Sequence, residues 1–272
     1  MAENADVALY LYRRRRGETF VILHDLSAGK GSAGKLKVGA RFTGRFYPSR
    51  CDLSPDGRHF VYFVMGGAQK TVGQRLYCWT AMSEPPSLTA IFLVPQDDTW
   101  GGGGRFLDNR NLVIEAGMHD GVERLAAFHD RSFAGVHVQV KSGYVKLPEA
   151  KGLRAAKPQR DGGWRSSLKG KLAPGDREET KSAKRAVLIR KLHPEFVRRG
   201  DFASNVYELA GSDNTPLLPP ELMARVNWAD FDRKGRLLLS VGQEVRIYGK
   251  PAPGMGDKPD HVFDLEVATE PG

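Results

Sequence analysis

Short runs of apolar residues, each ended by turn residues, recur along almost the whole chain. The runs are rich in β-branched and aromatic side chains, and few stretches show the period of an amphipathic helix. The pattern predicts strands at Val7–Tyr12, Thr19–His24, Arg50–Leu53, His59–Met65, Arg75–Ala81, Leu88–Val94, Asn111–Ala116, Val122–Phe128, Val136–Val140, Gly143–Leu147, Ala186–His193, Asn205–Ala210, Arg225–Phe231, Arg236–Val241, Glu244–Tyr248 and His261–Val267. Many short strands separated by turns are typical of an all-β sandwich, barrel or propeller.

Three segments share one pattern, which is an apolar anchor, a tight polar turn and a more apolar strand. They are Leu53–Phe63, Phe106–Glu115 and Phe231–Ser240. Asp56-Gly57 and Lys234-Gly235 place a glycine where such a turn needs positive φ, and Asn109 tolerates that region better than most residues. The interval from the first anchor to the second is close to the roughly 40–50 residues of one propeller blade, and the next interval leaves room for two units and an insertion.

The segment Cys51–Tyr62 resembles the Ser-Pro-Asp-Gly turn of TolB-like and WD40-like β-propellers, where this turn joins the two inner strands of a blade. The whole chain is also similar to uncharacterised bacterial proteins that share the stretches Arg50–Gly57 and Thr99–Phe106, a likeness that implies no activity. The resemblance implies a single all-β propeller domain over residues 1–272, with four or five blades. It also implies that Val7–Tyr12 or Thr19–His24 closes the ring beside Glu244–Tyr248 or His261–Val267.

The positive charge of the chain is concentrated in one region. The 272 residues carry a formal net charge of +9, yet Lys141–Gly200 alone holds 17 Lys and Arg against 6 Asp and Glu. Within it, Pro148–Lys184 has few large apolar side chains, which bury too little surface to offset the entropy of ordering. We therefore expect residues 148–184 to be a basic, flexible insertion between strands, with a turn or two of helix at Asp176–Lys184.

Two motifs resemble sites for nucleotides or metals but lack a required part. Gly29–Lys35 satisfies the Gly-x-Gly-x-x-Gly pattern, but Leu36 stands where a phosphate loop has a hydroxyl, and no helix is predicted after it. Asp52–Gly57 begins like a calcium loop, but Phe63 stands where the bidentate Glu belongs. We expect neither motif to hold a cofactor.

No complete catalytic constellation is recognisable in the sequence. The His119-Asp120 and His129-Asp130 pairs lie in predicted strands and turns, whereas the metal phosphohydrolases that use such pairs present them from helices. No Gly-x-Ser-x-Gly, His-Glu-x-x-His or Cys-x-x-Cys motif is found. We therefore expect no cofactor, no metal and no catalysis, although an active site assembled from separate blades would leave no linear motif.

Two groups of residues are candidates for binding. The first is a glycine loop in which Trp100 could stack on a ligand that approaches the backbone closely; the alternative is a crowded turn near a propeller axis. It comprises Trp100, Gly101, Gly102, Gly103 and Gly104. The second group could contact a polyanion through its charges, with Trp164 as a stacking group, although the first four arginines also fit a solubilising hairpin tip. It comprises Arg13, Arg14, Arg15, Arg16, Lys157, Arg160, Trp164, Arg165, Lys169 and Lys171.

The expected setting is the cytoplasm. Glu3 and Asp6 make the start of the chain unlike a signal peptide, no apolar stretch is long enough to span a membrane, and Cys51 and Cys78 are too few for a disulfide framework. The repeated segments and the lack of a recognisable catalytic constellation favour a non-catalytic recognition or scaffold module that binds a protein partner and no membrane. The alternatives are an electrostatic nucleic-acid or polyanion binder, and an enzyme with a hydrolase or nucleotide site in the central channel.

Overall fold

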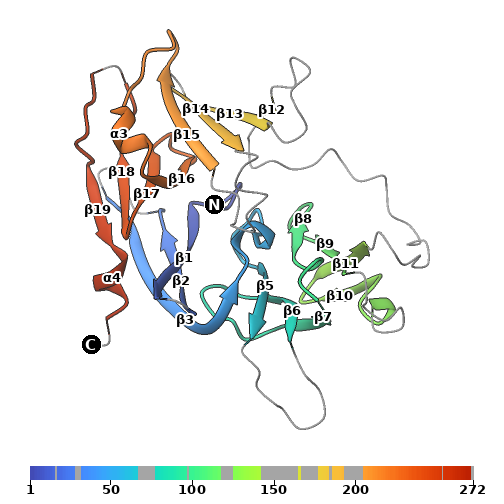
Figure 1. Cartoon of the computed structure of the whole chain (residues 1–272). Helices are drawn as coiled ribbons and strands as arrows, with labels where there is room; N and C mark the ends of the chain where they lie inside the picture. The colour runs from blue at the N-terminus through green and yellow to red at the C-terminus, as the bar shows by residue number, and fades with distance from the viewer. Residues whose placement is uncertain are drawn as a thin grey trace. The chain divides into compact units, whose positions relative to one another are not determined.

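The chain folds into β-sheets in two compact units. The computed structural model describes residues 1–15, 17–27, 32–66, 77–96, 98–117, 125–141, 165–166, 177–183, 186–192, 205–252 and 254–270. We call Ala2–His24 with Leu36–Arg160 the N-terminal unit, and Met1, Asp25–Lys35 and Asp161–Gly272 the C-terminal unit. The fold class is all-β, as predicted, and none of the sheets formed by the described residues closes on itself (Figure 1). No helix in this part of the chain is long and apolar enough to cross a membrane.

The N-terminal unit begins with a seven-stranded sheet. Its order is β1-β2-β3-β5-β6-β7, and β4 pairs with β5. The strands are β1 (Val7–Arg15), β2 (Glu18–Asp25), β3 (Lys35–Phe46), β4 (Asp52–Leu53), β5 (Phe60–Gly66), β6 (Cys78–Ser83) and β7 (Phe92–Gln96), and a short 3-10 helix, η1 (Pro48–Arg50), precedes β4. One face buries an aromatic cluster that includes Phe46, Phe60 and Tyr62, so alternate residues of these strands supply the core.

A second sheet of the same unit has the order β10-β11-β9-β8. Its strands are β8 (Gly104–Phe106), β9 (Asn111–Glu115), β10 (Arg131–Phe133) and β11 (Val136–Lys141), and β11 runs parallel to β9. Val61 and Met82 of the first sheet pack with Phe106, Leu112 and Ile114 of the second. The two sheets therefore share one core.

The C-terminal unit contains two four-stranded antiparallel sheets in which each strand pairs with the next along the chain. They are built from β12 (Arg165–Ser166), β13 (Arg177–Ala183), β14 (Ala186–Leu192) and β15 (Asn205–Gly211), and from β16 (Val226–Phe231), β17 (Leu237–Val241), β18 (Glu244–Tyr248) and β19 (His261–Asp264). Two short helices, α3 (Pro220–Met223) and α4 (Leu265–Ala268), complete the described part. Leu188, Tyr207, Phe231 and Leu239 lie in one core cluster, so both sheets contribute to it.

Two of the three similar segments form the same turn. Gly57 has φ +74° and donates its N–H to Ser54 O at 2.8 Å, and Gly235 has φ +76° and donates to Asp232 O at 3.0 Å. The apolar anchor that precedes each turn donates its N–H to the aspartate before it, at 3.0 Å in the first segment and 2.8 Å in the second. Glycine is needed at both places because a Cβ disfavours this backbone conformation.

The segment Phe106–Glu115 does not follow this scheme. Asn109 is not among the described residues with positive φ, so our expectation for it was wrong. Its side-chain Oδ1 instead accepts the N–H of Asp56 at 3.0 Å, and Asp52 Oδ2 accepts the N–H of Phe106 at 2.9 Å. The segment that contains Asn109 therefore joins the two sheets of the N-terminal unit.

The expected ring closure by the first strands is not among the strand pairings of the described residues. β1 and β2 belong to the seven-stranded sheet with β3, whereas β18 pairs with β17 and β19. Consecutive strands joined by short connections usually pair with one another, and β1, β2 and β3 do so here. The expectation came from the propeller resemblance and not from the pattern of these residues.

Three local predictions also need correction. The strand expected at Val122–Phe128 is wrong in its described half, because Leu125 and Ala126 are helical and Leu125 O accepts the N–H groups of Phe128 and His129. The helix expected at Asp176–Lys184 is the strand β13, since pairing with β14 over its whole length overrides local propensity. The strand expected at His261–Val267 ends at Asp264, whose Oδ1 accepts the N–H groups of Glu266 and Val267 and caps α4. The strands β3, β8, β10, β12 and β13 had not been predicted at all.

Candidate functional site

The glycine loop at residues 101–104 is crowded by the protein itself. Gly102 and Gly103 have φ +96° and +93°, which only glycine adopts easily. A Cβ at Gly102 would overlap the Phe63 ring and Gln96 Oε1, and one at Gly103 would overlap Arg50. A Cβ at Gly101 would overlap the backbone of Gly117. These contacts favour the crowded-turn alternative for the glycines, because protein atoms already occupy the space beside them.

Buried polar side chains, those of Thr80 and Gln96, form hydrogen bonds at the base of this loop. Thr80 Oγ1 accepts the N–H of Gly103 at 2.7 Å and a Gln96 Nε2 hydrogen at 3.1 Å. Gln96, which is 2% exposed, also donates to Glu115 O at 3.1 Å. The N–H of Gly103 bonds to Thr80 of β6, and the N–H of Gly102 and the carbonyl of Gly103 bond to Glu115 of β9, so the loop backbone has little freedom.

Arg50 holds the outer part of the loop. Its guanidinium donates to Thr99 O at 2.8 Å and also to Gly101 O, so it bonds the backbone on both sides of Trp100. The N–H of Trp100 in turn donates to Asp98 Oδ1 at 2.8 Å. The Trp100 side chain is 83% exposed. The loop therefore presents a large aromatic ring to solvent on a fixed backbone.

A row of basic side chains lies on the outer face of β3. Lys37, Arg41 and Arg45 are exposed and stand four residues apart, so they share one face of the strand. Phe42 and Phe46 point to the other face, where they pack in the aromatic core. We call Lys37, Arg41 and Arg45 the basic row. Sequence reasoning missed it, although the alternation of basic and apolar residues from position 35 to 46 was visible.

The end of β1 adds to this basic surface through a shared carboxylate. Glu18 of β2 contacts Arg15 Nε at 2.8 Å and Arg41 at 3.2 Å, and β2 lies between β1 and β3. The side chains of Arg15 and Arg41 are 76% and 60% exposed, whereas that of Glu18 is only 8% exposed. The carboxylate is therefore covered by two arginines whose outer faces remain accessible.

The basic row is connected to the Trp100 loop by direct contacts. The Arg45 and Arg50 guanidinium groups lie 5.0 and 5.5 Å from the centre of the Tyr47 ring. Arg50 also lies 5.3 Å from the centre of the Phe63 ring. Such cation–π contacts orient the guanidinium groups. Because Arg50 then bonds the carbonyls on either side of Trp100, Tyr47 and Arg50 link the end of the basic row to the Trp100 loop within the N-terminal unit.

The predicted polyanion residues are only partly described. Arg13 and Arg15 are exposed and Arg14 is half-buried, all at the end of β1. Arg165 lies in β12 opposite Thr180. The others lie outside the described residues; they are Arg16, Lys157, Arg160, Trp164, Lys169 and Lys171.

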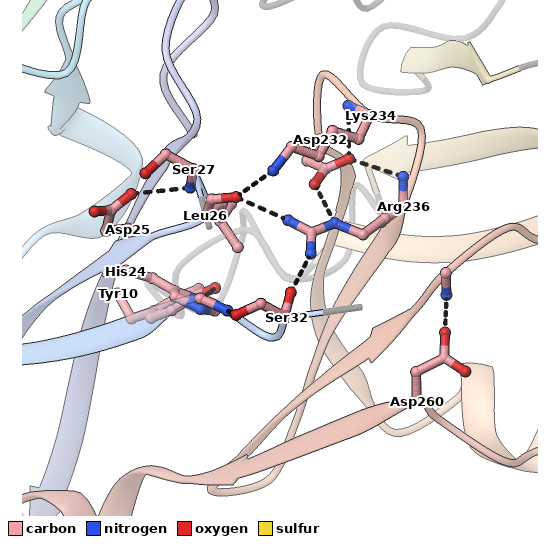
Figure 2. Close-up of polar contacts among 12 residues, drawn as sticks. Tyr10, His24, Asp25, Leu26, Ser27, Ser32, Asp232, Lys234, Arg236 and Asp260 are labelled. Carbon is pink, nitrogen blue, oxygen red and sulfur yellow. Dashed lines mark hydrogen bonds and ion pairs between the residues drawn. The ribbon is translucent and has the colours of Figure 1, made fainter. Parts of the chain in front are cut away.

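The predicted glycine motif at Gly29–Lys35 is followed by β3 and not by the helix that a phosphate loop requires. Figure 2 shows how the chain before and within the motif is held within the C-terminal unit. Lys234 Nζ donates to Leu26 O at 2.7 Å, and Arg236 donates to Leu26 O at 3.2 Å and to Ser32 O at 2.8 Å. These cations satisfy backbone carbonyls, which is a structural role.

Several other titratable groups of the described residues take part in hydrogen bonds and ion pairs. Among the described residues, no three His, Cys, Asp or Glu side chains gather as a metal site would require. His129 Nδ1 accepts the N–H of Val140 at 3.1 Å, while Asp130 pairs with His137 at 3.1 Å. Burial raises the pKa of the Cys51 thiol to about 12, which disfavours the reactive thiolate.

Comparison of the chain with protein-family models, curated proteins and solved structures found no match.

Proposed function

We propose that this protein is a non-catalytic, cytoplasmic binding module that engages a polyanion through the outer face of β3. The observation that carries the proposal is the basic row, together with the two exposed arginines that cover Glu18. β1 and β3 contain no Asp or Glu, and Glu18 of β2 offsets only part of the charge of Arg15 and Arg41. Phosphate or sulfate groups that replace condensed counterions at such a surface bind with strongly salt-dependent affinity.

We also propose that the sheets are blades of a propeller of four or five units. The antiparallel meander β16–β19 and the repeated turn at Gly57 and Gly235 support this architecture. The two free cysteines, Cys51 and Cys78, support the cytoplasmic assignment, because secreted domains more often pair theirs.

The test is chromatography on heparin with two matched triple variants. One variant replaces Lys37, Arg41 and Arg45 by Gln, and the control replaces Arg225, Lys250 and Lys258, three exposed cations of the C-terminal unit. Both remove the same charge. We expect the first variant alone to elute at much lower salt, and the slope of log affinity against log salt to fall by about 2–3.

Equal losses in the two variants would contradict the proposal, because a specific surface would not exist. Failure of the unmodified chain to bind heparin at about 50 mM salt would contradict it as well. Circular dichroism of both variants controls for the fold.

A second candidate function is a protein scaffold, which the exposure of Trp100 favours, since exposed tryptophans often anchor protein interfaces. The test is recovery of a co-purifying protein at about 0.5 M salt, where phosphate contacts are largely screened. If a scaffold function holds, Trp100→Ala should abolish that recovery and the basic-row variant should not.

A further inference from the structure

The basic row forms a track that is one strand wide. A strand rises about 3.3 Å per residue, so Lys37 and Arg45 lie roughly 26 Å apart along β3, with Arg41 midway. The cations stand on a single line because they share one face of one strand. A single line of cations suits one flexible phosphate backbone.

One end of the track is linked to the loop that carries an exposed aromatic ring. Arg45 and Arg50 contact the same Tyr47 ring, and Arg50 bonds the carbonyls of Thr99 and Gly101 on either side of Trp100. Trp100 is 83% exposed, and its loop is fixed by the glycine packing and by the hydrogen bonds of Thr80 and Gln96. An aromatic ring held in this way needs little further ordering when a ligand stacks on it.

The combination of a line of cations with an exposed tryptophan discriminates between classes of polyanion. Heparin carries negative charge but no aromatic group to stack on an indole. The bases of a duplex are paired and stacked on one another, whereas those of a single strand can turn outward and stack on aromatic side chains. A line of cations followed by an exposed tryptophan is the arrangement that binds single strands.

We propose that the surface formed by the basic row, Arg50 and Trp100 binds single-stranded nucleic acid. The basic row contacts the phosphates and Trp100 stacks on a base. Arg50 is a positioning residue, because its Nη1 donates to the loop carbonyls on either side of Trp100. The recognition is independent of sequence, since phosphate contacts and stacking do not read base edges. This inference rests on the proposed polyanion-binding function.

The experiment measures fluorescence anisotropy of a labelled oligothymidylate of about 20 nucleotides and of a duplex of the same length, at equal salt, with heparin as a third ligand. We expect the single strand to bind more tightly than the duplex. Trp100→Ala should weaken single-strand binding by about 5- to 150-fold, the range that loss of one stacked base gives. The same change should leave heparin binding unaltered.

Tyr77→Ala is the matched control, because Tyr77 is another exposed aromatic residue of the N-terminal unit, at 51% exposure. It should leave single-strand binding unchanged. Trp100→Phe should retain most of the affinity, and quenching of tryptophan fluorescence by the oligonucleotide should be lost in this variant. Circular dichroism verifies that each variant is folded.

The experiment distinguishes failure of the proposed polyanion-binding function from failure of this inference. If neither oligonucleotide nor heparin binds, the proposed function falls and this inference falls with it. If heparin and duplex bind but the single strand binds no more tightly and Trp100→Ala changes nothing, only this inference is overturned. If Trp100→Ala abolishes recovery of a protein at high salt and leaves oligonucleotide binding unchanged, Trp100 is a protein anchor and the inference is likewise overturned.

Discussion

Replacing Gly102 by alanine should destabilise the N-terminal unit far more than the same change at Gly135. Both glycines have positive φ, +96° and +78°, and alanine in that region costs about 1–2 kcal/mol. At Gly135 nothing lies within 4 Å of the new Cβ, whereas at Gly102 it would overlap the Phe63 ring and Gln96 Oε1. Forcing a methyl group into a packed site adds about 1–3 kcal/mol. We expect a loss of roughly 2–5 kcal/mol for Gly102→Ala against roughly 1–2 kcal/mol for the control.

The measurement is thermal unfolding followed by circular dichroism. With about 2–4 °C per kcal/mol for a chain of this size, Gly102→Ala should lower the Tm by roughly 4–20 °C and Gly135→Ala by roughly 2–8 °C. The difference between the two variants isolates the packing contribution. Equal shifts would refute the reasoning, because they would mean that the loop relaxes around the methyl group and that its backbone is not fixed.

Three further predictions concern buried groups. Asp232→Ala should lower the free energy of unfolding in urea by about 3–5 kcal/mol, because it leaves the largely buried Arg236 guanidinium without its carboxylate. A smaller loss of unfolding free energy for Asp232→Asn would support this cause. Cys51 should react with a thiol reagent at pH 8 only after unfolding, because burial raises its pKa to about 12; reaction of the folded chain at the rate of a free thiol would contradict this. Burial lowers the pKa of His59, so the unfolded chain binds the proton more readily. Stability should be full above the ordinary pKa of 6.5 and fall as the pH decreases below it, and His59→Asn should flatten that dependence in unfolding measured from pH 7.5 to pH 5.

The parts of the fold that depend on local chemistry could be predicted from the sequence. The turns at Gly57 and Gly235 need positive φ and a nearby carboxylate or hydroxyl, and both requirements are met within a few residues. A continuous apolar run likewise gave β5, and regular alternation gave β18, nearly to their ends. The grouping of strands into sheets depends on contacts between distant residues, which no local pattern contains.

β3 was missed because its glycines resemble turn residues. Both lie where another part of the chain approaches closely: a Cβ at Gly39 would overlap Pro86, and one at Gly44 would overlap Met65 O. A glycine inside a strand can mark such an approach as well as a break. The basic residues next to these glycines were therefore not assigned to one strand, and the basic row was not recognised.

The candidate site was predictable only in part for a related reason. Trp100 and the arginines at the end of β1 stand out in the sequence by their own chemistry. Arg50 does not, because its role comes from carbonyls that lie 49 and 51 residues away. No local pattern indicates that one arginine fixes a distant loop.

The alternation within β3 separates binding from stability. Phe46, which is 1% exposed, packs in the core from the same strand that presents Arg41 and Arg45 to solvent. Truncation of the phenylalanine to alanine removes buried apolar surface and should cost about 3–5 kcal/mol, whereas neutralising exposed arginines changes stability by less than about 1 kcal/mol. The basic row can therefore be altered without loss of the fold. A change in nucleic-acid affinity in those variants then reports on the surface itself, because the core that positions it is intact.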